Sequence, residues 1–335
     1  MRAFVVTGPH RSEVRDVEDP VPAPGHVVID IDRVGVCGTD VELFTGEMAY
    51  LQQGHAAYPI RLGHEWCGTV SAAGDGVDPG WLGRRTTGDT MLGCGRCDRC
   101  RAGRPWVCED RYEVGIRGGF PGALAERMAM PVTALHPLPG AVDDVAGAMV
   151  EPGGSALRSV WAAGLQPGER VLVLGPGTIG LLTASFASAA GAEVHVIGMD
   201  ASREDLARTM GASRYRTLSD PPSRSYDAVV DCSGDAAVPA LALRYVEPAG
   251  RMVYIGVSGK PSPVDSRDLV LNDITAVGIL GASAGLAPAI GHYADGRVDP
   301  GPLVHVVVGL DRAVEAFDGR LDPSPGTKIH VDPRL

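Results

Sequence analysis

The sequence predicts an α/β protein of two domains, one mostly β and one built on a doubly wound parallel sheet. The chain has 335 residues, more than one hydrophobic core usually serves, so two domains of roughly 150 residues are expected. The N-terminal part is rich in Gly, Pro and short β-branched runs such as HVVIDI at residues 26–31. That texture is typical of short strands joined by tight turns. From about residue 169, strand-like runs alternate with alanine-rich stretches, which indicates βαβ units.

The elements of the parallel-sheet domain follow in alternating order. The run VLVL at residues 171–174 predicts a buried strand, and residues 181–190 predict the helix after it. The same pattern predicts strands at 194–197, 228–230, 252–255 and 274–280, and helices at 203–210 and 236–245. Residues 1–7 predict a further strand at the start of the chain. After about residue 285 Pro and Gly become frequent again, so we assign residues 1–150 to the β domain and 151–285 to the parallel-sheet domain.

Composition and charge exclude several classes of function. The hydrophobic fraction is 44%, and no run reaches the roughly 18 apolar residues that a membrane span needs. Residues 1–7 lack the long apolar stretch and cleavage site of a secretory signal, so we expect a cytoplasmic protein. The net charge is -11 and the basic pair Arg84 and Arg85 is small. Both facts argue against a nucleic-acid partner, whose phosphates need clustered Lys and Arg.

Four of the seven cysteines form the pattern C-x2-C-x2-C-x7-C, at Cys94, Cys97, Cys100 and Cys108. Four thiolates this close in sequence suit the closed tetrahedral site of a structural zinc ion. Disulfides and an iron-sulfur cluster are the alternatives, but seven cysteines in a reducing compartment and the usual cluster spacings disfavour them. A closed site leaves no position for a substrate, so we expect catalysis elsewhere.

A glycine-rich turn follows the first strand of the parallel-sheet domain. The G-x-G-x-x-G motif GPGTIG lies between the strand at 171–174 and the helix at 181–190, which is the context that a dinucleotide-binding (Rossmann) motif requires. Its backbone and glycines predict a pyrophosphate site at the helix N-terminus, formed by Gly175, Gly177, Thr178, Ile179 and Gly180. A bare glycine loop is the alternative. The motif therefore predicts an NAD(P) coenzyme.

A second group of metal-binding residue types lies near the N-terminus. The segment GVCGTD holds Cys37, and the segment GHE holds His64 and Glu65. Alone, each would usually be a packed or satisfied polar residue. Joined in this order to the four-cysteine lobe, they resemble the zinc-dependent medium-chain alcohol dehydrogenases. Cys67 and Cys232, by contrast, are interpreted as packed thiols.

The resemblance covers essentially the whole chain and implies a fold and a site. It implies a GroES-like catalytic domain, to which residues 286–335 return, and a Rossmann coenzyme domain. Carried over by motif, the catalytic zinc ligands would be Cys37, His64 and either Glu65 or Glu151, the latter in the sequence VEP. Thr39 would hydrogen-bond the reacting oxygen, with a turn-capping role as the alternative. Glu42 stands where many relatives have a proton-relaying histidine, so either Glu42 or water would carry the proton outward.

The residue at the end of the second strand indicates which coenzyme is preferred. Most NAD-binding domains have an acidic residue there for the ribose hydroxyls. This chain has Gly198 at that position, followed by Met199 and Asp200. A glycine removes the carboxylate that would repel a 2′-phosphate, which slightly favours NADP. Asp200 remains able to reach the ribose, and Arg203 is common in both coenzyme classes.

The resemblance also implies a substrate class and an assembly. Glu151 and the motif around Thr39 resemble the polyol, threonine and sugar dehydrogenase branch, so the expected substrate is a secondary alcohol or ketone of a polyol, cyclitol, sugar or hydroxy amino acid. The rivals are a zinc-free quinone reductase, a zinc-stabilised nucleotide-binding redox sensor without turnover, and a nucleic-acid-binding zinc module. A homodimer or homotetramer is expected, with residues 274–280 as the strand that pairs across a dimer.

Overall fold

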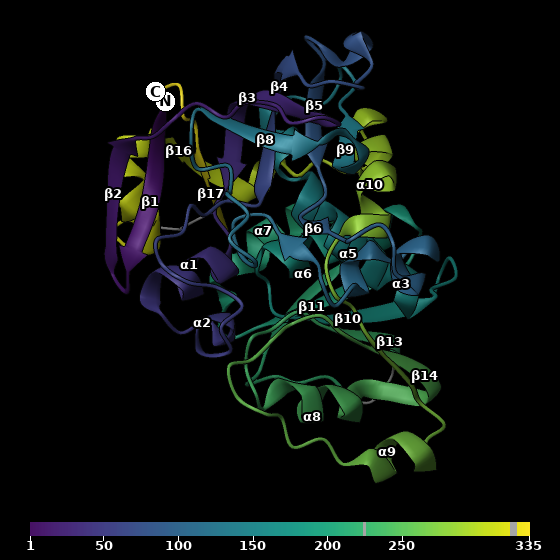
Figure 1. The fold of residues 1–335 in the computed structure, drawn as a ribbon. Helices are drawn as coiled ribbons and strands as arrows, with labels where there is room; N and C mark the ends of the chain where they lie inside the picture. The colour runs from purple at the N-terminus through teal and green to yellow at the C-terminus, as the bar shows by residue number, and fades with distance from the viewer. Residues whose placement is uncertain (224–225, 322–326) are drawn as a thin grey trace.

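The computed structural model describes residues 1–223, 226–321 and 327–335 of the chain. Two large sheets with their helices form the mixed α/β architecture that the sequence predicts (Figure 1). No helix among the described residues is long and apolar enough to cross a membrane.

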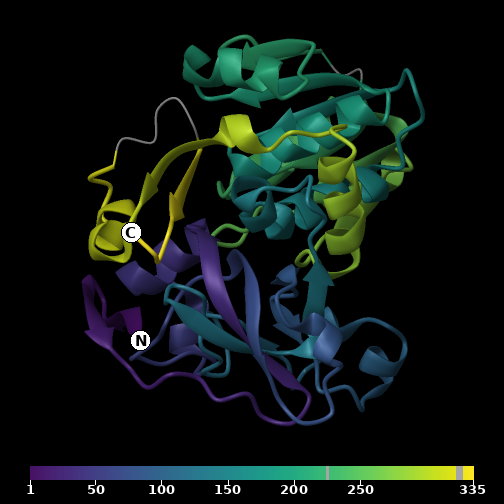
Figure 2. The same cartoon turned by 90° about the horizontal axis from the view of Figure 1, so that it is seen from above.

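Strands from both ends of the chain build the first sheet. Within the described residues its order is β16 (Val304–Val308), β17 (Lys328–Val331), β3 (His26–Gly35), β4 (Glu65–Ala73), β5 (Arg85–Gly88) and β9 (Leu135–Pro137), with β8 (Arg127–Pro131) also paired to β3. Two hairpins flank it, formed by β1 (Arg2–Gly8) with β2 (Arg11–Asp16) and by β6 (Met91–Leu92) with β7 (Tyr112–Glu113). Figure 2 shows the yellow C-terminal strands lying between the purple and blue strands and the teal and green domain. The end of the chain therefore contacts both halves of the molecule.

The second sheet is entirely parallel. Its order is β12 (Arg214–Thr217), β11 (Glu193–Gly198), β10 (Arg170–Leu174), β13 (Tyr226–Asp231), β14 (Val246–Tyr254) and β15 (Thr275–Gly278). Counted along the chain this is 3-2-1-4-5-6, the order of a dinucleotide-binding sheet. The order reverses between β10 and β13, so a crevice opens there beyond the carboxyl ends of the strands.

Helices cover both faces of this sheet. Alternate residues of β10 point to opposite faces: Val171 and Val173 pack in one core, Leu172 and Leu174 in another. The first core holds α5 (Val150–Ala163), α6 (Thr178–Ala189), α7 (Glu204–Thr209) and α10 (Leu286–Ala294), and the second holds α8 (Val238–Ala242). Figure 1 shows α8 and α9 (Ser266–Leu271) on the side away from the first sheet. The shorter helices are α1 (Gly38–Thr45), α2 (Ala49–Gln52), α3 (Asp98–Arg101), α4 (Asp144–Ala148) and α11 (Ala313–Phe317).

Some boundaries differ from those expected from the sequence pattern. The helix expected at 236–245 is shorter, because α8 starts beside Pro239 and passes into a 3-10 turn over Leu243–Tyr245. The strand expected at 252–255 starts earlier, because Val246 is buried and pairs with Tyr226 of β13. The segment after residue 285 divides in space: α10 packs against α5, whereas β16 and β17 join the first sheet.

Candidate active site

Three metal-binding residue types meet at the ends of β3 and β4. One ligand atom each of Cys37, His64 and Glu65 lies within 4.8 Å of the others. The sheet register explains this proximity, because Gly35 near the end of β3 pairs with Glu65 at the start of β4. A side chain at residue 35 would meet Glu65 Oε2 at 2.3 Å, so glycine is required beside the cluster. The site residues from GVCGTD and GHE are thus brought together by strand pairing.

The buried side chain of Asp40 contacts the residues of this cluster and fixes their orientation. Its carboxylate is fully buried, accepts the N–H of Cys37 at 3.0 Å and the N–H of Gly63 at 3.1 Å, and lies 3.3 Å from His64 Nδ1. Burial by itself would raise the pKa of Asp40, but His64 and the two N–H donors outweigh it and lower that pKa. Burial likewise opposes the charged form of His64, yet the Asp40 carboxylate raises the pKa of His64 well above its usual value. Asp40 therefore fixes which His64 nitrogen faces the cluster.

A buried lysine reaches the cluster from the other end of the chain. Lys328 Nζ donates to both Glu65 oxygens, at 2.9 and 2.7 Å, and to the carbonyl oxygen of Val36 at 3.0 Å. No sequence motif indicates Lys328, because nothing near it in the sequence is typical of a site. Its rarity is a usable signal, since the chain has only two lysines, Lys260 and Lys328.

The other expected catalytic residues lie around this cluster. Glu151 starts α5 and lies outside the compact group of Cys37, His64 and Glu65. Burial raises the pKa of Glu151 to about 7; the charge of His64 opposes this rise and that of Glu65 adds to it. Thr39 is half-buried in the first turn of α1, and Glu42 is exposed one turn later. Partial burial and then the Glu47 carboxylate raise the pKa of Glu42.

The four clustered cysteines converge as the pattern predicts. The sulfur atoms of Cys94, Cys97, Cys100 and Cys108 lie within 4.8 Å of one another. None of the seven cysteines, all of which are described, is in a disulfide. Backbone N–H groups point at two of the sulfurs, since Cys97 Sγ accepts from Cys100 and Cys108 Sγ accepts from Cys94, each at 3.5 Å. A side chain at Gly93 would meet Cys100 Sγ at 2.7 Å, so glycine lets the loop close around the sulfurs.

The two remaining cysteines stay apart from both clusters. Cys67 is fully buried and its thiol donates to the carbonyl oxygen of Asp144 at 3.3 Å, as a packed thiol does. Cys232 lines the large cavity of the parallel-sheet domain and lies 3.9 Å from the hydroxyl of Thr183. Burial raises the pKa of Cys232 to about 12, which keeps its thiol protonated and unreactive.

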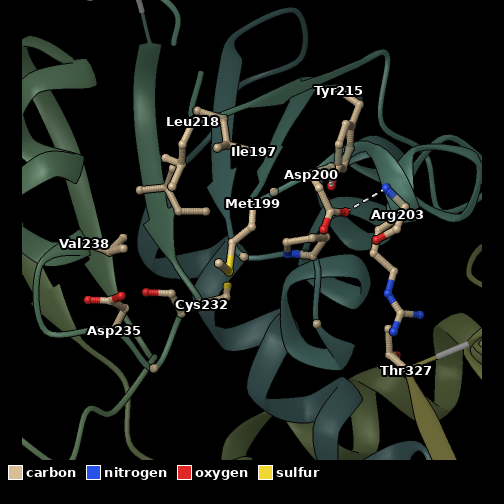
Figure 3. Close-up of a pocket in the computed structure, with 18 of the residues that line it drawn as sticks. Ile197, Met199, Asp200, Arg203, Tyr215, Leu218, Cys232, Asp235, Val238 and Thr327 are labelled. Carbon is tan, nitrogen blue, oxygen red and sulfur yellow. Dashed lines mark hydrogen bonds between the residues drawn. The ribbon is translucent and has the colours of Figure 1, made fainter. Parts of the chain in front are cut away.

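A cavity of about 680 Å³ opens at the carboxyl ends of β10, β11 and β13 (Figure 3). Of the expected coenzyme residues, Gly175, Gly177, Gly198, Asp200 and Arg203 line it. Thr178, Ile179 and Gly180 form the first turn of α6 behind that lining. Gly175 has a φ of 95°, and a side chain at Gly180 would meet the Gly175 carbonyl oxygen at 1.9 Å. The turn and the close packing therefore require both glycines.

Tyr215 fills the space beside Gly198. A side chain at residue 198 would meet the Tyr215 hydroxyl oxygen at 1.8 Å. That hydroxyl donates to the backbone oxygen of Asp200 at 2.7 Å, and the Asp200 side chain accepts the N–H of Ser202 at 2.8 Å. From the sequence, Gly198 is notable because it supplies no carboxylate at the end of β11. The structure adds a steric reason for glycine, because Tyr215 occupies the space that a side chain at residue 198 would need.

Known protein families match both halves of this arrangement. Residues 23–140 match the family described as "Alcohol dehydrogenase GroES-like domain", and residues 178–292 match "Zinc-binding dehydrogenase". L-threonine 3-dehydrogenase of Idiomarina loihiensis is 33% identical over 278 residues, 79% of this chain and 80% of the relative. The chain belongs to the zinc-dependent medium-chain alcohol dehydrogenase superfamily. It is accordingly an NAD(P)-dependent oxidoreductase that acts on an alcohol or carbonyl group of a small molecule.

Two further relatives cover more of this dehydrogenase. A 2-dehydro-3-deoxy-L-galactonate 5-dehydrogenase of Pseudoalteromonas atlantica is 29% identical, over 93% of this chain and 92% of the relative. The crystal structure of a putative zinc-binding dehydrogenase of Sinorhizobium meliloti 1021, bound to NADP, superposes with a TM-score of 0.91 at 29% identity and covers 99% of each chain. The dehydrogenase therefore shares its whole architecture with this family.

Proposed function

We propose that this dehydrogenase interconverts a secondary alcohol and a ketone of a polyol, sugar, sugar acid or hydroxy amino acid, with zinc at Cys37 and His64. The convergence of Cys37, His64 and Glu65 at one edge of the first sheet carries the proposal. Threonine and the galactonate derivative, named in two of the relatives, are both hydroxy acids. A hydroxy acid or polyol is therefore the first class to test.

The residues present fit a catalytic zinc ion. A thiol, an imidazole and a carboxylate are the donor types that zinc prefers, and fewer than four firm protein ligands leave a position for substrate. Cys37 and His64 would hold the ion, with Glu65 or Glu151 as the third ligand. Glu65 is engaged by Lys328, whereas burial raises the pKa of Glu151 to about 7, so a bound cation would stabilise its ionised form. When bound, zinc supplies Lewis acidity that polarises the substrate oxygen.

The chain's own residues would position the substrate and move the proton. Thr39, in the first turn of α1 two residues after Cys37, would hydrogen-bond the reacting oxygen and begin the proton relay, as the resemblance implies. Glu42, one turn further along α1 and exposed, would pass that proton to water. The coenzyme would lie along the cavity of the second sheet with its pyrophosphate at the start of α6. Fixing the distance between the two reacting carbons is then the main contribution of the fold.

We propose a slight preference for NADP over NAD. Gly198 places no carboxylate at the end of β11. Tyr215 and Arg203 both line the cavity, with the Tyr215 hydroxyl beside Asp200 and the Arg203 guanidinium nearer Thr327 (Figure 3). A hydroxyl and a guanidinium suit a phosphate, whereas a carboxylate would repel it. Asp200 lines the cavity too, so NAD is expected to bind with lower affinity rather than to be excluded.

The same proposal covers the lobe, the domains and the assembly. The four-cysteine lobe would hold a second, structural zinc ion. Residues 1–150 and 286–335 would form the catalytic domain and residues 151–285 the coenzyme domain. Edge strand β15 is largely exposed, so pairing with the same strand of a second copy would give a homodimer, or a homotetramer from two such dimers. A monomeric molar mass in solution by light scattering would contradict this assembly.

Nicotinamide absorbance with both coenzymes tests the proposed activity. The substrate panel contains L-threonine, sugar acids, polyols, cyclitols and simple secondary alcohols. We expect turnover with one class, stronger with NADP, and loss of turnover on chelation. Silence across the panel, in a protein that binds two zinc ions and coenzyme, would favour the non-catalytic redox sensor instead.

A further inference from the structure

Two consecutive residues connect the coenzyme cavity to the metal cluster. Thr327 lines the coenzyme cavity (Figure 3). Lys328, the first residue of β17, reaches Glu65. The side chain of Thr327 contacts Thr178, whereas that of Lys328 contacts Glu65. The two neighbours therefore serve different sites, one on each domain, through a single stretch of backbone.

The contact on the coenzyme side is made at the first turn of α6. The hydroxyl of Thr178 lies 3.0 Å from the hydroxyl of Thr327 and donates to the backbone oxygen of Thr327 at 3.3 Å. Thr178 is the first residue of α6, where the N–H groups point toward a bound pyrophosphate. Any shift of this turn on coenzyme binding acts directly on Thr327.

The contact on the metal side is tight and buried. The side chain of Lys328 is 4% exposed and that of its partner Glu65 is 1% exposed. Lys328 also donates to the backbone oxygen of Val36, the residue before Cys37. A displacement of Lys328 would therefore move both the carboxylate of Glu65 and the backbone that carries Cys37.

The strand between the two contacts is firmly paired. β17 lies between β16 and β3, and the N–H of Val36 donates to the backbone oxygen of Ile329 at 3.0 Å. Thr327 directly precedes this strand and donates its N–H to the backbone oxygen of Leu303 at 3.0 Å, so a shift at residue 327 would be passed on to Lys328 through the peptide bond that joins them.

We propose that Thr327 is a positioning residue that couples coenzyme binding at α6 to the position of Glu65 beside the metal. The inference rests on the proposed metal site and adds a route between the two sites. A coenzyme held at the first turn of α6 would act on the contact between Thr178 and Thr327, and Lys328 would transmit the change to Glu65. The position of Glu65 relative to Cys37 and His64 would thereby depend on the presence of coenzyme. Since coupling is reciprocal, a change at Lys328 also alters coenzyme affinity.

The visible spectrum of the cobalt-substituted enzyme tests the coupling without turnover. We expect oxidised coenzyme to shift the cobalt bands in the wild-type protein and in Thr327→Ser, which keeps the hydroxyl. Thr327→Val removes the hydroxyl at nearly the same volume, and its cobalt spectrum should stay unchanged when coenzyme binds at saturation. An equal shift in Thr327→Val would overturn the coupling. Bands that Cys37→Ser leaves unaltered would instead contradict the proposed metal site itself.

Coenzyme affinity gives a second, independent measurement. Lys328 does not line the coenzyme cavity, yet Lys328→Arg should weaken coenzyme binding by about 3- to 10-fold, the loss of roughly one hydrogen bond passed along β17. In the Thr327→Val background the same substitution should have no further effect. Dissociation constants from protein fluorescence complete this cycle, and additive effects of the two substitutions would refute the route through Thr327.

Discussion

Lys328 and Glu65 form a buried ion pair across 263 residues of sequence, with the ammonium group bonded to both carboxylate oxygens. The pair joins the last strand of the first sheet to the start of β4, where the proposed metal ligands meet. A buried charge that loses its partner is strongly destabilising. The pair is thus both a structural element of the catalytic domain and a constraint on Glu65.

Removal of the lysine should therefore destabilise the protein. We expect Lys328→Met to lower the free energy of unfolding by about 3–5 kcal/mol, because Glu65 is left buried and unpaired. Urea unfolding followed by tryptophan fluorescence measures the change. The exposed Lys260 offers the matched control, Lys260→Met, which should change the free energy by less than about 0.5 kcal/mol. Equal effects of the two substitutions would show that the ion pair between Lys328 and Glu65 does not contribute to the free energy of unfolding.

Loss of either proposed ligand should remove turnover and spare the coenzyme site. Cys37→Ala or His64→Ala should lower kcat by about 1000-fold or more, because a Lewis acid supplies several kcal/mol of stabilisation. Coenzyme should still bind, and its dissociation constant, measured by fluorescence, should change by no more than about 10-fold, since the cavity lies on the other sheet and is coupled to the metal cluster only through β17. Cys67→Ala, a buried thiol outside the cluster, should keep most of the activity. Loss of coenzyme binding in the ligand variants would indicate misfolding instead.

The four-cysteine lobe should depend on its zinc for stability. Cys100→Ser should release one zinc ion per chain and expose residues 94–108 to proteolysis, because structural zinc contributes folding free energy. Metal content by mass spectrometry and the rate of limited proteolysis provide the measurements. Cys232→Ser is the control and should retain both zinc ions. A fully stable, zinc-replete Cys100→Ser protein would argue against the closed site.

Coenzyme preference should depend on the pair Gly198 and Tyr215. Gly198→Asp alone should impair binding of both coenzymes, because the new side chain meets the Tyr215 hydroxyl. The double variant Gly198→Asp, Tyr215→Ala removes that clash, and its carboxylate should favour NAD over NADP by about 10-fold or more. The ratio of the two dissociation constants decides the matter. An unchanged ratio in the double variant would show that the residue at the end of β11 does not determine the preference between NAD and NADP.

Stability should fall in mildly acidic solution because of His330. This side chain is fully buried on β17, with both ring nitrogens unpartnered, and burial followed by the charge of Lys328 holds its pKa well below the usual value. Below pH about 6.5, His330 binds a proton in the unfolded chain but stays neutral in the folded chain. The free energy of unfolding therefore falls by up to about 1.4 kcal/mol for each pH unit. Above that pH the effect vanishes.

Urea unfolding from pH 5 to 8 should show this slope in the wild type and in the exposed-site control His55→Leu. The slope should be reduced in His330→Leu, and a slope that survives there unchanged would assign it to other groups.

Local patterns predicted most of the architecture. The G-x-G-x-x-G turn between a strand and a helix, the alternation of strands and helices after residue 169, and the four-cysteine spacing all encode short-range geometry. The structure confirms the parallel sheet and the convergence of the four sulfurs, and it adds the strand order 3-2-1-4-5-6. Boundaries such as the early start of β14 were not predicted, because burial of Val246 depends on the neighbouring strand.

The sequence by itself therefore determined the coenzyme fold, the cysteine lobe and the residue types of the metal cluster, because those depend on neighbours along the chain. Only the tertiary structure decided what surrounds them. It placed Lys328 on Glu65, Thr327 against Thr178, and Tyr215 in the space beside Gly198. Each of these contacts joins elements that the chain order keeps apart. Strand pairing and domain packing determine these contacts, and neither can be predicted from the spacing of residues along the chain.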